Sequence, residues 1–247
     1  MELYMDFGNS SVKWASGEEL AQGVTHSCPS GDPAATLIPR LQGSRRPAQV
    51  HIATVLQPER LSDLQAWMAS YWQITPAFAR TRDAELGVVN GYRIPEQLGV
   101  DRWLGLLAGR AISKRPLLVV DCGTATTLDG MNGEGRHLGG AILPGLALFS
   151  RCLRAHTDLP DWEDSDDIDG FATDTAAGIA SGAMLATTSS IETMRERLRE
   201  VSGGDVDCLL TGGFANLVAD HLTSTYRLVP HLILQGLRLQ ARQIERQ

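Results

Sequence analysis

An apolar strand-like segment that runs into an aspartate, with a glycine two residues later, occurs twice in this chain of 247 residues. The first copy carries Asp6 and Gly8, and the second carries Asp121 and Gly123, so each half of the chain opens with the same pattern. The duplication predicts two related α/β halves that face each other across a cleft, with one carboxylate from each half at its floor. Phosphoryl transfer from a nucleotide is the chemistry that such a cleft serves best.

The residues around each aspartate can serve phosphate groups in two ways. Backbone N–H groups of a glycine turn form a concave anion site, and the carboxylate can hold Mg²⁺ through water, since Mg²⁺ dehydrates reluctantly. Lys13 follows the first turn and would reach a phosphate as a point charge. For one copy alone, a tight hairpin built by Asp6 and Asn9 is the more common interpretation. The second copy, with Thr124 after its glycine, favours the phosphate role, and no P-loop or dinucleotide-binding glycine motif competes with it.

The composition excludes several other classes of function. A net charge of −7 argues against a nucleic-acid surface, which needs clustered Lys and Arg. The four cysteines are scattered without metal-ligand spacing, so we expect neither a zinc site nor a disulfide framework. Strand-like residues reach Asp6 almost at once and no long apolar stretch follows, so we expect no signal peptide and no membrane span. These features predict a cytoplasmic protein.

Hydrophobic periodicity predicts an α/β organisation in two halves, residues 1–115 and 116–247, divided where Pro116 breaks the chain. Each half is expected to hold a mixed central sheet flanked by helices. Residues 138–145 are rich in glycine and predict a loop that allows close backbone approach, and the acidic residues 158–169 predict a solvated loop. The expected strands are residues 3–6, 12–15, 50–55, 117–120, 126–129 and 208–210, and the expected helices are 61–72, 101–113, 175–201 and 231–246.

Two further motifs are candidates for chemistry. Asp101 begins a predicted helix, where it is either a cap or first-turn acid or the base that accepts a hydroxyl proton from a substrate. Arg102 beside it offers a planar fork to an acceptor's hydroxyl, carbonyl or carboxylate. Gly212 and Gly213 follow a predicted buried strand and would suit the approach of adenine or ribose to bare backbone, although such pairs are also common in ordinary turns.

Taken together, these segments resemble the type III pantothenate kinases, a branch of the superfamily of acetate kinases, sugar kinases, Hsp70 and actin. The resemblance covers nearly the whole chain, and the step from Gly99 through Val100 and Asp101 to Arg102 is its most specific part. It implies two ribonuclease H-like (actin-like ATPase) domains with a cleft between them. The matching segments are residues 6–10, 99–102, 121–127, 139–145, 174–175 and 211–213.

The resemblance implies ATP-dependent phosphorylation of pantothenate to 4′-phosphopantothenate, the first step of coenzyme A biosynthesis. It implies that Asp101 is the proton acceptor, that Asp6 holds magnesium, and that Asp121 binds a monovalent cation, potassium or ammonium. It also implies a homodimer whose pantothenate pocket is completed at the subunit interface. The implied ATP-binding residues are Asp6, Gly8, Asn9, Ser10, Lys13, Thr124, Gly212 and Gly213, and the implied pantothenate-binding residues are Tyr92, Gly99, Val100, Asp101, Arg102 and Thr175.

Two alternatives remain at this point. One is a non-catalytic regulatory protein like the Bvg accessory factors, and the other is a related kinase of the same superfamily acting on another small molecule. Asp6, Asp101 and Asp121 are all present, which argues against a protein that has lost its catalytic groups.

Overall fold

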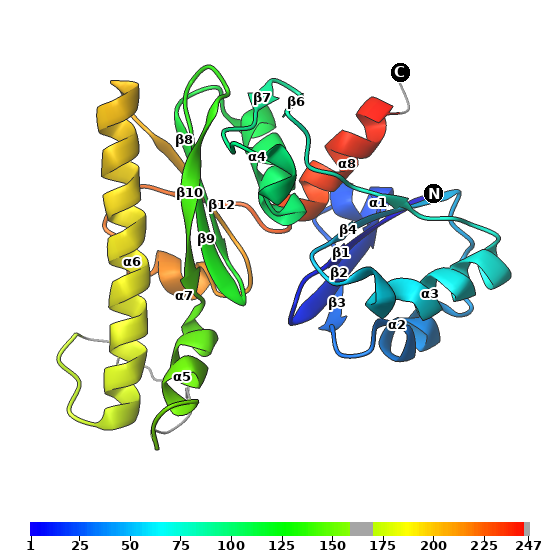
Figure 1. The fold of residues 1–247 in the computed structure, drawn as a ribbon, viewed down its shortest axis with the longest axis horizontal. Coiled ribbons are helices and arrows are strands. Elements are labelled where there is room, and N and C mark those ends of the chain that lie inside the picture. Colours follow the sequence, from blue (N-terminus) through cyan, green and yellow to red (C-terminus); the bar gives the residue numbers. More distant parts are fainter. Residues whose placement is uncertain (159–169, 245–247) are drawn as a thin grey trace. The chain divides into compact units, whose positions relative to one another are not determined.

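The computed structural model describes residues 1–158 and 170–244 of the chain. The chain forms two compact units, one made of Met1–Ala108 with His231–Gln247 and the other of Gly109–Pro230. This division differs from the expected halves 1–115 and 116–247. The last helix, α8 (Leu232–Ile244), belongs to the first unit, where it contacts strands β1 and β4 (Figure 1).

The first unit is built on a five-stranded sheet in the order β3-β2-β1-β4-β5. Strand β1 (Glu2–Phe7) lies at its centre and pairs antiparallel with β2 (Ser11–Ser16), which pairs antiparallel with β3 (His26–Pro29). On the other side β1 pairs parallel with β4 (Gln49–Thr54), and β4 with β5 (Ala77–Phe78). Because side chains alternate along a strand, Leu3, Met5 and Phe7 share one face and enter the apolar core.

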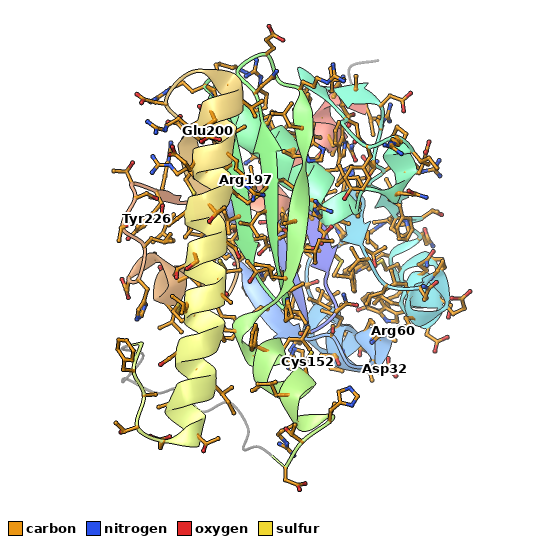
Figure 2. All side chains as sticks on the ribbon, turned by 60° about the vertical axis from the view of Figure 1, so that its left-hand side comes forward. Asp32, Arg60, Cys152, Arg197, Glu200 and Tyr226 are labelled. Atoms are coloured by element: carbon orange, nitrogen blue, oxygen red, sulfur yellow. The ribbon has the colours of Figure 1, made fainter. Side chains whose placement is uncertain are left out.

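Helices cover both faces of this sheet. Apolar residues of α2 (Pro33–Leu41), α3 (Ser62–Trp67) and the π-helical turn η2 (Met68–Trp72) complete the core beneath β1. Asp32 caps α2 by accepting a hydrogen bond from the Ala35 N–H at 3.0 Å (Figure 2). Helix α1 (Gly17–Ala21) and α8 contact the strands from the other side.

A long connection leads from this sheet to helix α4 (Val100–Ile112). It contains a two-stranded hairpin of β6 (Ala84–Glu85) and β7 (Val88–Val89), and a 3-10 turn η3 (Pro95–Gln97). Helix α8 packs closely on α4, because a Cβ at Gly236 would collide with the Leu104 carbonyl.

The second unit repeats the sheet of the first. Its order is β10-β9-β8-β11-β12, with β8 (Leu117–Cys122) at the centre. Strands β9 (Ala125–Met131) and β10 (His137–Pro144) pair antiparallel, and β11 (Asp207–Thr211) and β12 (Arg227–Leu228) pair parallel. Its helices are α5 (Leu146–Arg154), α6 (Thr175–Ser202) and α7 (Ala215–Ala219). The two sheets therefore have the same topology, and the duplicated pattern in the sequence marks the central strand of each.

Two details correct the expectations from sequence, and a third expectation falls almost wholly outside the described residues. Residues 138–145 are not a loop, since β10 pairs with β9 from His137 to Pro144 across an irregularity at Gly139. The expected helix over residues 61–72 is divided between a 3-10 turn η1 (Pro58–Leu61), α3 and η2. The acidic segment 158–169 lies, apart from its first residue, outside the described residues.

No helix of the described part of the chain combines the length and apolar character needed to cross a membrane.

Candidate functional site

The two aspartates of the repeated pattern occupy equivalent positions. Asp6 is the fifth of six residues of β1, and Asp121 is the fifth of six residues of β8. Both are partly exposed and stand where the central strand ends and its hairpin begins. In the first unit, Asp6 pairs across the strands with Lys13 on β2, so the two side chains leave the same face of the sheet.

The turn at residues 8–10 follows Asp6 and is fixed from two directions. The Gly8 N–H donates to the Ser11 carbonyl at 3.0 Å, which closes the hairpin. Ser30 then braces the turn: its N–H donates to the Ser10 carbonyl at 3.1 Å, and its hydroxyl donates to the Asn9 carbonyl at 2.6 Å. Asn9 and Ser10 themselves are exposed. Sequence reasoning missed Ser30, because nothing in its local sequence links it to a turn 20 residues earlier.

Lys13 lies near His231, the residue just before α8. The His231 ring accepts or donates a hydrogen bond with the Thr25 hydroxyl at about 3.0 Å. Burial lowers the pKa of His231, and the positive charge of Lys13 lowers that pKa further. A neutral imidazole at this place avoids repulsion with the lysine.

The beginning of α4 gathers four of the predicted residues. The Trp103 N–H donates to the Gly99 carbonyl at 3.0 Å, so the helix starts at Val100 and Asp101 lies in its first turn. The Asp101 carboxylate accepts a hydrogen bond from the Arg102 N–H at 2.8 Å. It also occupies the space beside Gly99, where a Cβ would come within 2.6 Å of Asp101 Oδ1. A side chain at position 99 would displace the carboxylate.

Arg102 and Tyr92 are joined directly. Arg102 Nη1 donates to the Tyr92 hydroxyl at 2.7 Å, and the guanidinium carbon lies 5.6 Å from the centre of the tyrosine ring. Arg102 is only 7% exposed although it carries a full charge. The structure therefore brings together the predicted pantothenate-binding residues Tyr92, Gly99, Asp101 and Arg102.

In the second unit, glycines crowd around Asp121. Gly212 follows β11 with a φ of +98°, and a Cβ there would collide with Asp121 Oδ1 and with the Cys122 carbonyl. The turn after β8 is also approached by Gly145, whose N–H donates to the Thr124 carbonyl at 3.0 Å. A Cβ at Gly145 would lie 2.6 Å from that oxygen. Gly213 has open space around it.

Thr175 is the first residue of α6 and is exposed. The preceding Asp174 caps the helix by accepting a hydrogen bond from the Ala177 N–H at 2.9 Å. The predicted residues thus form four local groups: the 8–10 turn and the start of α4 in the first unit, and the Asp121 turn and the start of α6 in the second.

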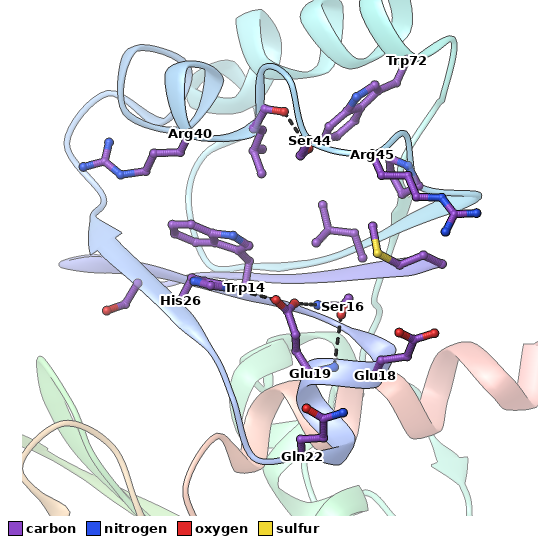
Figure 3. A pocket seen from close by; sticks show the side chains of 15 residues that line it. Trp14, Ser16, Glu18, Glu19, Gln22, His26, Arg40, Ser44, Arg45 and Trp72 are labelled. Carbon is purple, nitrogen blue, oxygen red and sulfur yellow. Dashed lines mark hydrogen bonds and ion pairs between the residues drawn. The ribbon is translucent and has the colours of Figure 1, made fainter.

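A cavity of about 700 Å³ in the first unit contains none of the predicted residues (Figure 3). Its walls include Leu3, Trp14, Ser16 and Trp72. Leu3 pairs with Ser16 at the opposite end of the β1–β2 hairpin from the 8–10 turn. The cavity is therefore separate from the predicted phosphate turn.

Comparison with known proteins gives one consistent result. The sequence model described as "Type III pantothenate kinase" matches residues 2–197. A type III pantothenate kinase of Nitrosococcus oceani is 33% identical over 246 residues, covering 96% of this chain and 92% of the relative. That of Halorhodospira halophila is 34% identical over 248 residues, covering 96% of each.

Solved structures share the fold at low sequence identity. A Campylobacter jejuni protein described as a Baf family transcriptional activator aligns with a TM-score of 0.64 at 19% identity, over 99% of this chain and 100% of that one. The acetate kinase of Porphyromonas gingivalis aligns with a TM-score of 0.51 at 10% identity, over 99% of each chain. These similarities confirm the expected fold, two ribonuclease H-like units of the actin-like ATPase type. With the family model and the full-length relatives in agreement, this chain belongs to the type III pantothenate kinase family.

Proposed function

We propose that this protein transfers the γ-phosphoryl group of ATP to the hydroxyl group of pantothenate, giving 4′-phosphopantothenate and ADP in the first step of coenzyme A biosynthesis. One observation carries the proposal beyond family membership. The first turn of α4 presents a partly exposed carboxylate, Asp101, directly beside a buried guanidinium, Arg102, that is bound to Tyr92. This arrangement offers a proton acceptor and an anchoring group for one small polar substrate.

Asp101 is the proposed acceptor of the hydroxyl proton. A phosphoryl transition state is loose, so positioning of the hydroxyl group and neutralisation of charge contribute more than a strong base does. The hydrogen bond from the Arg102 N–H holds the Asp101 carboxylate in one orientation. Arg102 and Tyr92 would bind the carboxylate and polar groups of pantothenate, because a guanidinium matches a carboxylate in two parallel hydrogen bonds. Gly99 and Val100 would line the same pocket.

The 8–10 turn and Lys13 are proposed to hold the ATP phosphates. Gly8, Asn9 and Ser10 form an exposed, braced turn whose backbone can approach an anion, and Lys13 adds a positive charge on the same hairpin. Magnesium would be held near Asp6. The described residues contain no cluster of three or more His, Cys, Asp or Glu able to hold a metal, which fits an ion bound mainly by water and phosphate oxygens with one carboxylate. Bound there, magnesium would neutralise phosphate charge.

The Asp121 turn is proposed to serve ATP and a monovalent cation. Asp121 Oδ1 and the Cys122 carbonyl both adjoin the bare Cα of Gly212. Carboxylate and carbonyl oxygens suit potassium or ammonium, and the missing side chain at Gly212 lets both of these oxygens lie close to its backbone. Thr124, Gly212 and Gly213 would contact the nucleotide.

We further propose that Thr175 belongs to the pantothenate pocket and that two copies of the chain form a homodimer. The dimer is proposed from the family resemblance, and one exposed apolar side chain on α6, Leu185 at 61%, is compatible with it. Light scattering coupled to size-exclusion chromatography measures the oligomeric state directly. A monomer at all protein concentrations would contradict the proposed homodimer.

A coupled assay of ADP release tests the function. Purified protein with Mg²⁺ and K⁺ is expected to release ADP in response to pantothenate, and to show no response to acetate or to sugars. Mass spectrometry of the product should show the mass of pantothenate plus one phosphoryl group. If pantothenate causes no stimulation above background ATP hydrolysis, the proposed function is wrong.

A further inference from the structure

A group of buried side chains ties segment 79–98, which carries Tyr92, to helices α4 and α8. Glu85 is at its centre, with a side chain that is 2% exposed. Its Oε2 accepts a hydrogen bond from Trp103 Nε1 on α4 at 3.4 Å and another from Gln240 Nε2 on α8 at 2.5 Å. Arg82 Nε lies 3.6 Å from its Oε1. One carboxylate therefore contacts two helices and its own segment.

Gln240 adds a second attachment. It is 2% exposed, and its Oε1 accepts from the Arg80 N–H at 3.1 Å while its Nε2 donates to the Arg80 carbonyl at 2.9 Å. Both ends of the amide are thus bound to the backbone of one residue. The start of segment 79–98 is fixed to α8 at Arg80 and, five residues later, at Glu85.

Short-range hydrogen bonds connect this fixed start of the segment to Tyr92. The β6–β7 hairpin turns at Leu86 and Gly87, both with positive φ, which matches a tight two-residue turn. Asn90 closes the hairpin, with its N–H donating to the Asp83 carbonyl at 2.8 Å. The Asn90 Oδ1 then accepts from the Tyr92 N–H at 3.0 Å. This hydrogen bond ties the backbone of Tyr92 to the end of the hairpin.

On helix α4, two consecutive residues contact segment 79–98. Trp103, the partner of Glu85, is fully buried on α4 and follows Arg102, the partner of Tyr92. Segment 79–98 and the start of α4 are therefore held together twice, at Glu85–Trp103 and at Tyr92–Arg102. A buried carboxylate is costly unless it is well supplied with donors, and an apolar cluster could hold the same elements together. Directional hydrogen bonds additionally fix how segment 79–98 is aligned along α4 and α8.

We propose that Glu85 and Gln240 are positioning residues for the acceptor substrate. They hold segment 79–98 on α4 so that Tyr92 and Arg102 present one preformed surface to pantothenate. Neither residue touches the substrate. This inference rests on the proposed function, since it assigns a purpose to the geometry of that same pocket.

The test is a kinetic comparison of the full-length protein with Glu85→Ala. The substitution removes the carboxylate oxygen that accepts from Trp103 and Gln240. The expected result is an increase of about tenfold in the KM for pantothenate, the scale of losing a hydrogen bond to a buried charged group. The KM for ATP should stay unchanged. The conservative variant Glu85→Gln keeps a carbonyl oxygen that can accept from both Trp103 and Gln240, so it should recover much of the loss.

Glu192→Ala is the matched control. Glu192 also accepts several hydrogen bonds, from the Thr223 and Ser224 N–H groups at 3.0 Å each, but it lies in the other unit. The control variant should have the pantothenate KM of the wild type. Circular dichroism verifies folding, and if Glu85→Ala does not fold, Trp103→Phe removes a single donor and is assayed in its place.

The outcomes separate the two proposals. A higher pantothenate KM in Glu85→Ala that Glu85→Gln largely recovers supports the positioning role. A wild-type KM in Glu85→Ala or Trp103→Phe overturns it and leaves the proposed function intact, as does a loss of stability with both KM values unchanged. Absence of pantothenate-dependent ADP release in the wild type refutes the proposed function itself, and the positioning role with it.

Discussion

The guanidinium of Arg102 donates a hydrogen bond of 2.7 Å to the hydroxyl of Tyr92, ten residues earlier in the chain. The arginine is buried in the first turn of α4, while the tyrosine is partly exposed on segment 79–98. The contact links the segment to the helix beside the partly exposed Asp101. Changes to either partner are therefore expected to affect substrate affinity as well as local structure.

Asp101→Asn should lower turnover by a factor of about 10² to 10⁴, the usual contribution of a general base. The change is isosteric, so the melting temperature should stay within a few degrees of the wild type. Steady-state ADP release and circular dichroism measure the two effects. Asp32→Asn is the control, because Asp32 caps α2 outside the proposed site and Asn caps helices equally well. Wild-type turnover in Asp101→Asn would leave Asp101 as a first-turn acid only.

Gly212→Ala should lower the free energy of unfolding by about 2 kcal/mol or more, because a left-handed residue acquires a side chain. The φ of Gly212 is +98°, and the new methyl group would collide with Asp121 and Cys122. Urea denaturation measures the change. The neighbouring Gly213 has nothing within 4 Å of its Cβ position, so Gly213→Ala should alter that free energy by less than about 1 kcal/mol. Equal losses in both variants would contradict this account.

The stability of the first unit should fall as the pH drops below about 6.5, the usual pKa of histidine. Burial lowers the pKa of His231, so the unfolded chain binds the proton more readily than the folded one does. Stability from this group is therefore complete above pH 6.5 and is lost towards the lower folded pKa, with a slope of at most about 1.4 kcal/mol per pH unit. Burial also lowers the pKa of His51, with the same sign.

His231→Asn should reduce that pH dependence, since Asn tolerates the φ of 58° at this position. Denaturation followed by tryptophan fluorescence at a series of pH values measures the stability of the first unit. This unit contains Trp14, Trp67, Trp72 and Trp103. His221→Asn, at an exposed residue of the second unit, is the control. If the stability of His231→Asn depends on pH as that of the wild type does, His231 is not the group responsible.

Cys152 should react with a thiol reagent in the native protein, whereas Cys28, Cys122 and Cys208 should not. Cys152 is exposed on α5 (Figure 2), and the other three are buried. Burial raises the pKa of Cys122 and of Cys208 to about 12, which suppresses the reactive thiolate. Alkylation at pH 8 followed by peptide mass spectrometry identifies the modified residue. Rapid labelling of Cys122 without unfolding would show that β8 opens in solution.

Replacement of K⁺ by Na⁺ should lower activity, and NH₄⁺ should restore it. The larger ions suit carboxylate and carbonyl oxygens such as those of Asp121 and Cys122 beside Gly212. Initial rates at constant ionic strength measure the effect. Asp121→Asn should weaken the response to K⁺, and indifference of the wild type to the cation would remove this role from Asp121.

Much of the fold could be predicted because its strongest signals are local. The buried central strands and their terminal Asp6 and Asp121 are marked by contiguous apolar residues followed by small ones. Helix α2 was missed although Asp32-Pro33 is a typical helix start. Strand β10 was wrongly expected to be a loop, because glycine is unfavourable in strands. Its pairing with β9 outweighs that local preference.

The remainder of the site depends on contacts between distant residues. Ser30 braces the 8–10 turn, and Glu85 meets Gln240 across more than half of the chain. The hydrophobic periodicity of a single sequence does not indicate which distant residues form hydrogen bonds with one another. Helix α8 is a further example, because its apolar face shows that it packs on something but does not indicate which sheet it packs on.

The packing of α8 on β1 and β4 has a consequence for synthesis of the protein. Residues 109–230 leave the ribosome before α8 does, so the second unit can fold while the first still lacks a helix against its central strands. The sheet bearing Asp6 therefore gains its last covering helix only after the second unit has been synthesised. A nonsense mutation at residue 231 would leave a folded second unit attached to an incomplete, protease-sensitive first unit.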